Sequence, residues 1–359
     1  MANQYGNNLK LSIYGGSHDP RIGMRLSGFP KGFTLDNDAL MKFMVRRAPN
    51  GGAFSTPRKE PDVPEFLSGM EKNTTTGAEI HAIIQNTNAH SKDYSFVYDT
   101  PRPGHADYVA LCKYGPTVDL RGGGHFSGRL TAPLCIAGGM ALQYLATKGI
   151  RIGAHIEAIH GIHDKRFDET AVDANTLQQL ASSPFPVLDH EAGAAMQAEI
   201  TNARADKDSV GGVIECAVIG LPIGLGEHMF AGVEGRLSSI LFSIPAVKGV
   251  EFGAGFDVAN LYGSESNDPY VYRNEKVETA TNRCGGILGG MTNGMPLILR
   301  AAFKPTPSIA KEQQTVSLHQ KTNTVLSIPG RHDPTVVVRA VPVVEAAVAL
   351  AILDLLLDK

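Results

Sequence analysis

The pattern of apolar and polar positions along the chain predicts five helices. Thr34 and Asp36 offer caps for a helix that runs to about Arg47, where Ala48-Pro49 stops it. A second helix is expected from about Thr131 to Gly149, with Pro133 tolerated in its first turn. The others are an Ala-rich helix of about fifteen residues capped by Asp189, a helically spaced segment over 230–242, and a closing helix from about Pro342.

Shorter apolar runs predict strands between these helices. The expected strands cover 78–85, 95–98, 210–220, 296–303 and 335–341. Residues 257–280 and 310–325 are polar and are expected to be loops. Because strands and helices do not alternate regularly, the pattern favours an α+β fold over a doubly wound sheet. No linker separates two self-contained patterns, so we expect one domain over 1–359.

Composition indicates a globular protein and argues against a protein that binds nucleic acid or a membrane surface through its overall charge. Hydrophobic residues make up 43% and charged residues 19%, which is too apolar for disorder. The net charge of −3 gives no overall attraction to nucleic acid or membrane, and basic residues gather locally instead. Local clusters such as Arg121 with Arg129, or Arg331 with Arg339, suit a small anionic ligand.

Cysteine usage and the absence of a leader pattern predict the cytoplasm. The four cysteines are far apart, none forms a CxxC pair, and the first ten residues are polar. The most apolar stretch, 341–357, carries Glu345 and Asp354, so it reads as a core or interface helix rather than a membrane span.

Three glycine- or proline-bearing segments are candidates for anion binding. Residues 121–129 (RGGGHFSGR) precede a helix, where freed backbone N–H groups and the helix N-terminus can hold an anion, although a plain tight turn explains this segment equally well. Residues 304–308 (KPTPS) combine a lysine with two hydroxyls; alone, they favour a surface loop. Residues 330–334 (GRHDP) place three ionisable residues together, which is typical of a site loop.

Two histidines lie in glycine-bearing turns and are candidates for proton transfer. They are His18 in YGGSHDP and His105 in PRPGHADY, and histidine is the usual group for this task near neutral pH. No ligand cluster supports a metal, and no nucleophile-elbow, HExxH or Walker motif occurs. The glycine-rich run 210–226 lacks the spacing of a dinucleotide site.

Taken in order, these segments resemble the chorismate synthase family from end to end. The matching stretches include YGGSH, RRAP, STPRKEPD, PRPGHADY, DLRGGGHFSGRLTA, SIPAVKGVEFGAGF, GGILGG, KPTPSI and GRHDPTVVVRAVPVVEA. The resemblance implies a β-α-β sandwich of antiparallel sheets flanked by helices, assembled as a homotetramer. It implies a carbon–oxygen lyase that converts 5-enolpyruvylshikimate 3-phosphate to chorismate by 1,4-anti elimination of phosphate, the last common step of the shikimate pathway of aromatic amino acid biosynthesis. The cofactor implied is reduced FMN, with no net redox change.

The resemblance also assigns roles to residues of this chain. The implied catalytic residues are His18, His105 and Asp333, with His18 on the phosphate side and His105 on the flavin side. The implied substrate ligands are Arg46, Arg47, Arg129 and Arg331. The implied FMN contacts are His125, Phe126, Ser127, Pro245, Ala246, Gly289, Lys304, Pro305, Thr306, Pro307, Ser308 and Arg331.

Several positions depart from the family pattern, and they leave three outcomes open. The family usually carries a carboxylate where this chain has Gly16, a small residue at Asp19, and a basic residue at Ala53. In the glycine turn, His125 stands where the family usually has an arginine, and Phe126 where it usually has a small residue. Leu130 replaces a glutamate that is usual in the family. The chain is expected to be an active lyase. The alternatives are an altered substrate or flavin preference, or a catalytically impaired flavin-binding paralogue.

A nicotinamide-dependent flavin reductase is a third class of function. Some family members reduce their own flavin with NADPH, which is why NADP accompanies the family. The missing dinucleotide spacing and the lack of long insertions argue against this activity here. We therefore expect reduced flavin to come from another source.

Overall fold

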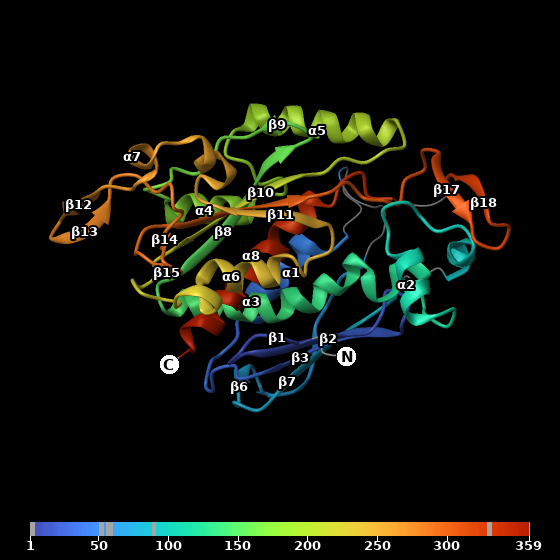
Figure 1. Cartoon of the computed structure of the whole chain (residues 1–359). Coiled ribbons are helices and arrows are strands. Elements are labelled where there is room, and N and C mark those ends of the chain that lie inside the picture. The colour runs from blue at the N-terminus through green and yellow to red at the C-terminus, as the bar shows by residue number, and fades with distance from the viewer. Residues whose placement is uncertain (1–3, 50–53, 55–59, 88–90, 329–331, 359) are drawn as a thin grey trace.

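Two five-stranded antiparallel sheets form the frame of the molecule (Figure 1). The computed structural model describes residues 4–49, 54, 60–87, 91–328 and 332–358. The first sheet has the order β1 (Gln4–Tyr5), β2 (Lys10–Tyr14), β3 (Arg21–Ser27), β7 (Ile80–Gln85) and β4 (Glu65–Ser68). The second has the order β11 (Val247–Phe252), β16 (Leu297–Phe303), β10 (Gly212–Ile219), β8 (Arg151–Ile159) and β9 (Ile162–His163).

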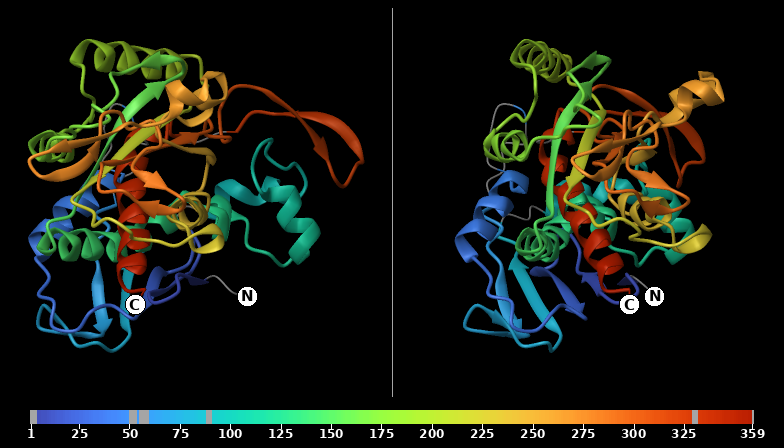
Figure 2. Two further views of the ribbon diagram at one scale, coloured as in Figure 1. Left: turned by 60° about the vertical axis from the view of Figure 1, so that its left-hand side comes forward. Right: turned by 90° about the vertical axis from the view of Figure 1, so that its left-hand side faces the viewer.

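A layer of helices lies between the two sheets (Figures 1 and 2). This layer contains α1 (Asn37–Arg47), α3 (Thr131–Thr147), α6 (Val233–Leu241) and α8 (Val337–Leu356). α3 packs against β3 and β7, while α8 packs against β8 and β10. α3 and α8 approach closely because α3 has a glycine at the contact: a Cβ on Gly138 would lie 2.3 Å from that of Ala346. The predicted β-α-β sandwich is therefore confirmed.

The outer face of the second sheet has its own, smaller core. α4 (Ala174–Ser182) packs on β8, and Leu177 of α4 fills the space that Gly153 leaves open. Leu177 belongs to a separate apolar cluster with Phe167, Ala217 and Ile298. α5 (His190–Ala205) lies beside β8 and β9. The second sheet is thus covered on both faces.

Most of the predicted elements are confirmed. Asp36 caps α1 by accepting a hydrogen bond from the N–H of Ala39, and Asp189 caps α5 in the same way through Glu191. α3 begins at Thr131, as predicted, and β7, β10 and β16 occupy three of the expected strand segments. The helix expected over 230–242 is shorter: α6 follows a 3₁₀ turn, η4 (Met229–Ala231).

Two of the strand predictions are wrong. Residues 95–98 belong to a 3₁₀ segment, η1 (Ser91–Tyr98), and the run 335–341 enters α8, which begins five residues before Pro342. The β-branched residues of α8 are buried in the helix layer against α3 and the second sheet. This tertiary packing overrides both their strand propensity and the helix-breaking tendency of Pro342.

Both predicted loops contain hairpins. Residues 257–280 contain the end of η5 (Gly255–Asn260), α7 (Gly263–Ser266) and the hairpin of β12 (Tyr270–Arg273) with β13 (Lys276–Thr279). Residues 310–325 contain β17 (Gln313–Ser317), which pairs with β18 (Thr322–Leu326). These hairpins are mainly solvent-exposed, so they lack the apolar face that marks a strand in sequence. The turn at Asn274 and Glu275 has positive φ at both residues, a conformation usually signalled by glycine.

One described helical stretch, Gly128–Thr147, is long and apolar enough to cross a membrane. Within an apolar 18-residue window of this stretch, 67% of the residues are buried inside the protein. Its apolar character is explained by its place in the helix layer, where it contacts a sheet and α8.

Candidate active site

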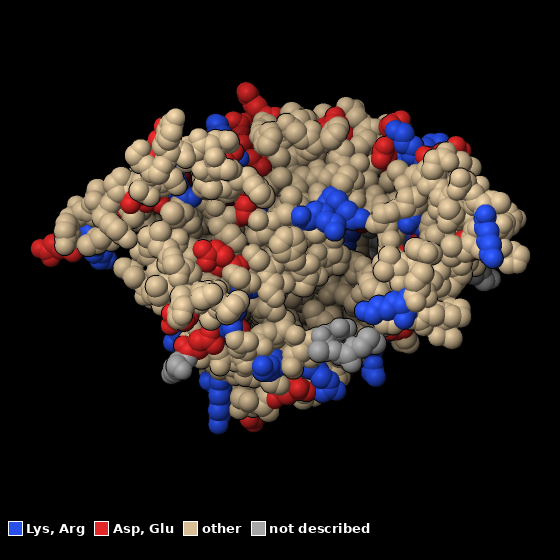
Figure 3. Space-filling view, viewed as in Figure 1, with Lys and Arg blue, Asp and Glu red and all other residues tan. Residues whose placement is uncertain are grey.

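A cavity of about 430 Å³ lies where the helix layer meets the glycine turn and the loop after β16. Figure 3 shows a hollow in the surface of the molecule, with basic side chains at its rim. Its lining combines cationic, hydroxyl and apolar groups, which suits an organic anion. The polar and charged residues of the lining are Ser17, Arg47, Glu60, Asn86, Arg102, His105, Ser127, Arg129, Thr131, Lys304, Thr306, Ser308, His332, Asp333 and Arg339.

The glycine turn η2 (Arg121–Phe126) passes between the two predicted catalytic histidines. Gly122 and Gly123 have φ of 57° and 97°, which only glycine adopts readily. A Cβ on Gly122 would lie 2.3 Å from Cε1 of His18, and one on Gly123 would lie 3.2 Å from Nε2 of His105. The glycines therefore allow the turn to approach both imidazole rings.

His105 is held by a buried ion pair. Nδ1 of His105 lies 2.8 Å from Oδ1 of Asp107 and 3.2 Å from Nη2 of Arg102. Arg102 donates to both oxygens of Asp107 at 2.7 Å. Burial alone would raise the pKa of Asp107, but hydrogen bonds from Arg102 and His105 hold it well below its usual range. These contacts fix Nδ1 against α2 (Asp107–Tyr114), while Nε2 faces the glycine turn.

The loop after β16 carries a lysine and two hydroxyls into the same cavity. Lys304 donates to the carbonyl of Gly104, and Ser308 accepts a hydrogen bond from Nη1 of Arg102 at 3.2 Å. Burial and the nearby Lys248 lower the pKa of Lys304. Oγ1 of Thr306 is buried and has no hydrogen-bond partner in the part of the chain that the structure describes. An unsatisfied buried hydroxyl in a cavity wall is a site for a polar ligand atom.

The backbone opposite this loop is also unusual. Pro245 and Ala246 line the cavity, and Ala246 has a φ of 76°, which is uncommon for a residue with a Cβ. The carbonyl of Ala246 accepts the N–H of Lys304 at 2.9 Å. This hydrogen bond ties the start of β11 to the lysine-bearing loop.

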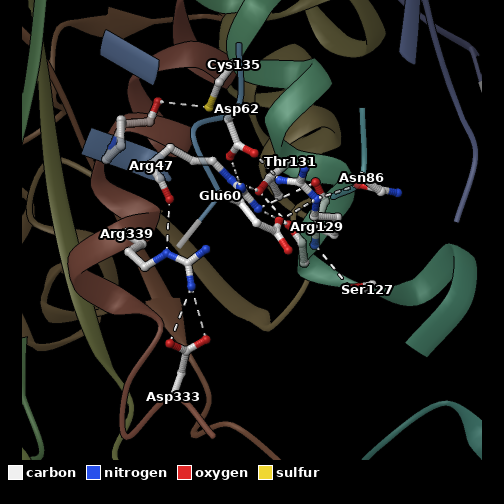
Figure 4. Close-up of polar contacts among 12 residues, drawn as sticks. Arg47, Glu60, Asp62, Asn86, Ser127, Arg129, Thr131, Cys135, Asp333 and Arg339 are labelled. Carbon is white, nitrogen blue, oxygen red and sulfur yellow. Dashed lines mark hydrogen bonds and ion pairs between the residues drawn. The ribbon is translucent and has the colours of Figure 1, made fainter. Parts of the chain in front are cut away.

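At another part of the cavity, two arginines share one carboxylate (Figure 4). Arg47, near the end of α1, donates to Oδ2 of Asp62 at 2.6 Å, and Arg129 donates to Oδ1 of the same residue. Nε of Arg129 lies 3.1 Å from Oε2 of Glu60. Nη2 of Arg129 is buried and has no hydrogen-bond partner among the described residues.

Arg339 and Asp333 extend this group of charges. Arg339 donates to the carbonyl of Arg47 at 3.0 Å and contacts Asp333 at 3.1 Å (Figure 4). Burial lowers the pKa of Arg339, and Asp333 opposes that shift. Asp333 therefore stands beside a cation in the cavity wall.

Some of the predicted site residues do not line the cavity. Arg46 pairs through both terminal nitrogens with buried Glu345, at 2.6 and 2.9 Å. His18 and His125 lie at the glycine turn, with Nδ1 of His125 3.2 Å from the carbonyl of Gly15. Pro305 is exposed, and Gly289 follows β14 (Ile287–Leu288). Arg331 and Ala53 lie outside the described residues.

The departures from the family pattern can now be placed. Oδ2 of Asp19 lies 3.4 Å from where a Cβ on Gly16 would be, so Asp19 returns a carboxylate to the place that Gly16 leaves without one. Phe126 lines the cavity and remains 36% exposed. Leu130 packs on the main core instead.

Sequence reasoning missed several polar residues that line the cavity or hold its lining side chains in place. Arg102 and Asp107 stand beside His105 in PRPGHADY, and Glu60 and Asp62 lie in STPRKEPD, so the motifs that carry the resemblance contain them. Arg339 was recognised only as part of a basic cluster. Nothing in the sequence indicated that Asn86 would lie beside Arg129, with its Oδ1 3.0 Å from Nε.

Among the described residues, no group of three or more His, Cys, Asp or Glu side chains is arranged to hold a metal ion. The fold and the cavity together define a class of protein: a β-α-β sandwich whose central cavity presents cations and hydroxyls to an organic anion.

Comparison with known proteins narrows this class. The family model described as chorismate synthase matches residues 9–357. The chain is 46% identical to the chorismate synthase of Lancefieldella parvula, covering 99% of this chain and 96% of the relative. It is 45% identical to that of Pyrococcus abyssi, covering 98% and 97%. A solved structure described as a crystal structure of chorismate synthase superposes with a TM-score of 0.77 at 26% identity, covering 99% of this chain and 93% of the other.

The chain therefore belongs to the chorismate synthase family. It is an enzyme, a lyase that acts on a phosphate-containing substrate.

Proposed function

We propose that the chain converts 5-enolpyruvylshikimate 3-phosphate to chorismate by 1,4-anti elimination of phosphate, with reduced FMN as cofactor. This reaction would be the last common step of the shikimate pathway of aromatic amino acid biosynthesis. The observation that carries the proposal is a cavity lined by two separate residues, Thr306 and Arg129, whose buried Oγ1 and Nη2 atoms have no hydrogen-bond partner among the described residues. Two anionic ligands, a flavin phosphate and a substrate, need two such places.

The lysine-bearing loop fits the flavin phosphate. Lys304 supplies a charge, Thr306 a hydroxyl that has no partner among the described residues, and Ser308 a second hydroxyl, all on the cavity wall. Pro245 and Ala246 would contact the cofactor from the facing backbone. The remaining proposed FMN contacts are His125, Phe126, Ser127, Gly289, Pro305, Pro307 and Arg331.

The arginine group fits the substrate, which carries a phosphate and two carboxylates. Nη2 of Arg129, which has no partner in the part of the chain that the structure describes, can donate to such an anion, and Arg47 stands beside it. Arg331 is proposed as a further ligand on the resemblance alone. Arg46 is the fourth proposed ligand, and its guanidinium donates to Glu345 in this structure.

The histidines and Asp333 would transfer protons and stabilise the charge of the leaving group. His18, kept cationic, would steady the leaving phosphate, and His105 would hold or move a proton on the flavin side through Nε2, the nitrogen that faces the glycine turn. Asp333 would take up a proton close to the flavin. When bound, reduced FMN supplies electron density to the substrate as phosphate leaves.

An anaerobic assay with reduced FMN and 5-enolpyruvylshikimate 3-phosphate tests this proposal, with phosphate release as the readout. His105→Ala should lower turnover by two or more orders of magnitude without loss of the fold, and unchanged turnover would remove His105 from the mechanism. The catalytically impaired paralogue predicts that FMN binds but that substrate does not tighten it. Titration of flavin with and without substrate separates the two readings, because strong mutual enhancement of binding excludes the paralogue.

We also propose a single-domain chain that assembles as a homotetramer in the cytoplasm. Large aromatic side chains stand exposed on the described surface, including Phe230 at 94%, Phe256 at 83% and Tyr272 at 82%, and aromatic residues are enriched at protein–protein interfaces. The four cysteines are unpaired, as a reducing compartment would leave them. The enzyme is expected to use flavin reduced elsewhere, and FMN reduction by the purified protein with NADPH would overturn that expectation.

A further inference from the structure

One buried carboxylate stands behind the two arginines of the substrate end. The side chain of Asp62 has no exposed surface, and it does not belong to the cavity lining. Its φ of 48° is a conformation that residues with a Cβ seldom adopt. The chain therefore accepts an unfavourable backbone conformation at the point where this carboxylate meets both guanidinium groups.

Each of the three guanidinium nitrogens of Arg47 already donates a hydrogen bond within the protein. Its Nε donates to Thr131 at 3.1 Å, Nη1 to Asp62 at 2.6 Å, and Nη2 to the carbonyl of Gly128 at 3.0 Å. These contacts come from three directions, so Arg47 cannot turn toward a ligand without breaking them. Within the described structure, Arg47 acts as part of the wall.

Arg129 is different because one of its donors is left over. Nη1 meets Asp62, and Nε meets Asn86 and Glu60, but buried Nη2 has no partner among the described residues. A guanidinium is planar and rigid, so fixing Nη1 and Nε also fixes the direction of Nη2. Asp62 therefore determines where the free donor of Arg129 lies.

We propose that Asp62 is a positioning residue: it orients Arg129 so that Nη2 receives an anionic group of the substrate. This inference rests on the proposed function. It also reassigns Arg47, whose main task becomes to brace Asp62 from the other side. One carboxylate oxygen serves each arginine, at Oδ2 and Oδ1, so a neutral amide cannot replace it at both.

Glu60 offers a matched control on the same arginine. Unlike Asp62, Glu60 lines the cavity, and its Oε2 lies 3.1 Å from Nε of Arg129. A carboxylate on the ligand side of Arg129 repels an anionic substrate. A carboxylate behind the guanidinium instead orients the guanidinium toward the substrate. Conversion of these two acids to amides should therefore change substrate affinity in opposite directions.

The test compares Asp62→Asn with Glu60→Gln in steady-state assays of the full-length enzyme with saturating reduced FMN. Asp62→Asn should raise KM for 5-enolpyruvylshikimate 3-phosphate at least tenfold, with kcat within threefold and FMN affinity within threefold of wild type. Glu60→Gln should lower KM two- to fivefold. If Asp62→Asn leaves KM unchanged, or if Glu60→Gln raises KM as much as Asp62→Asn does, the inference is wrong.

Asp62→Glu keeps the enzyme testable if the asparagine variant does not fold. It retains the charge but moves the carboxylate by one methylene, so it should bind FMN normally and still raise KM at least fivefold. A folded Asp62→Glu enzyme with wild-type KM would show that charge, not position, is what matters, and would overturn the inference. Absence of turnover in the wild-type enzyme would instead refute the proposed function, so the two failures are distinguishable.

Discussion

At the scale of single residues, the cavity separates two kinds of anion recognition. The loop 304–308 combines a lysine with hydroxyls, whereas the other part uses arginines held by carboxylates. A lysine acts as a point charge on a phosphate, while a fixed guanidinium imposes direction on its partner. This division predicts that substitutions in one group should affect flavin and substrate binding unequally.

Lys304→Met should weaken FMN binding by about ten- to one-hundredfold, because a hydrogen bond to a charged group contributes about 1.5–3 kcal/mol. Substrate KM, measured at saturating flavin, should change far less. Lys248→Met is the control, since Lys248 lies near Lys304 but is exposed and outside the cavity lining. Flavin titration followed by fluorescence measures both variants, and equal weakening would mean that only general positive charge matters.

Gly122→Ala should reduce turnover at least tenfold, because its Cβ would lie 2.3 Å from the His18 ring and displace it. Gly149→Ala has a similar positive φ, 80°, but its Cβ would meet nothing within 4 Å. It should lose some thermal stability and keep its turnover. If both variants keep wild-type kcat, the close approach of the glycine turn to His18 has no catalytic meaning.

At the scale of elements, the sequence predicted what depends on local chemistry. The caps Asp36 and Asp189 and the start of α3 at Thr131 followed from short-range rules, and each is present. The start of α8 could not be predicted by such rules. Its β-branched residues favour a strand in the sequence, and only their packing between α3 and the second sheet makes this segment helical. The exposed β12–β13 hairpin was missed for the opposite reason, since it has no buried face to leave a pattern.

The candidate site likewise has residues that the sequence motifs located and contacts that depend on tertiary packing. Motif order located the glycine turn, His105 and the lysine-bearing loop, all of which meet at the cavity. It could not show that Arg46 turns away toward Glu345, a residue 299 positions distant. Nor could it show that Asp62 joins Arg47 to Arg129, because such pairing depends on how three separate segments come together.

β8 and β10 carry a buried charged cluster outside the cavity. His155 has no exposed side-chain surface, and its two ring nitrogens lie 3.0 Å from Asp164 and 2.9 Å from Glu215. Burial alone would lower the pKa of His155, but the two carboxylates raise it above its ordinary value of 6.5. Burial would likewise raise the pKa of Asp164, but hydrogen bonds from His155 and two backbone N–H groups lower it from 3.8.

The two shifts define a pH window for stability. A raised histidine pKa stabilises the fold fully below 6.5, and this contribution is lost as pH rises through the folded-state pKa. A lowered aspartate pKa stabilises it fully above 3.8, and this contribution is lost as pH falls through the folded-state pKa. The cluster should therefore contribute most between about pH 4 and pH 6.5.

His155→Gln should lower the free energy of unfolding by about 3–5 kcal/mol, because it leaves two buried carboxylates without a cation. It should also remove the loss of stability above pH 6.5 that the wild type derives from this cluster. His160→Gln is the matched control: His160 lies 2.6 Å from Glu199, but its side chain is 65% exposed, so little change is expected. Thermal unfolding from pH 4 to pH 9 measures both, and equal destabilisation would show that burial of the cluster is irrelevant.

At the scale of the whole molecule, the sandwich leaves aromatic side chains on its surface. The β12–β13 hairpin projects from one end of the molecule (Figure 1), and its Tyr272 is 82% exposed. Phe230 on η4 is 94% exposed. Aromatic residues are enriched at protein–protein interfaces relative to the rest of the surface, and this observation favours an oligomer.

Phe230→Asp should therefore shift the protein from a species of about four times the 38.3 kDa chain mass toward smaller species. Light scattering coupled to size-exclusion chromatography measures this. Val109→Asp serves as the control and should leave the assembly unchanged. Val109 is 65% exposed on α2, which lies at the opposite end of the molecule from β12 and β13 (Figure 1). A wild-type protein that elutes as a monomer would contradict the tetramer.

The central claim is that this cavity catalyses elimination of phosphate with the help of reduced flavin but without its net oxidation. The most direct test is an anaerobic reaction of wild-type enzyme, reduced FMN and 5-enolpyruvylshikimate 3-phosphate, followed simultaneously for phosphate, chorismate and flavin absorbance. The account predicts one phosphate released for each chorismate formed over many turnovers, with the flavin still reduced when substrate is exhausted. No phosphate release at saturating flavin, or release that stops after one flavin is oxidised, would contradict it.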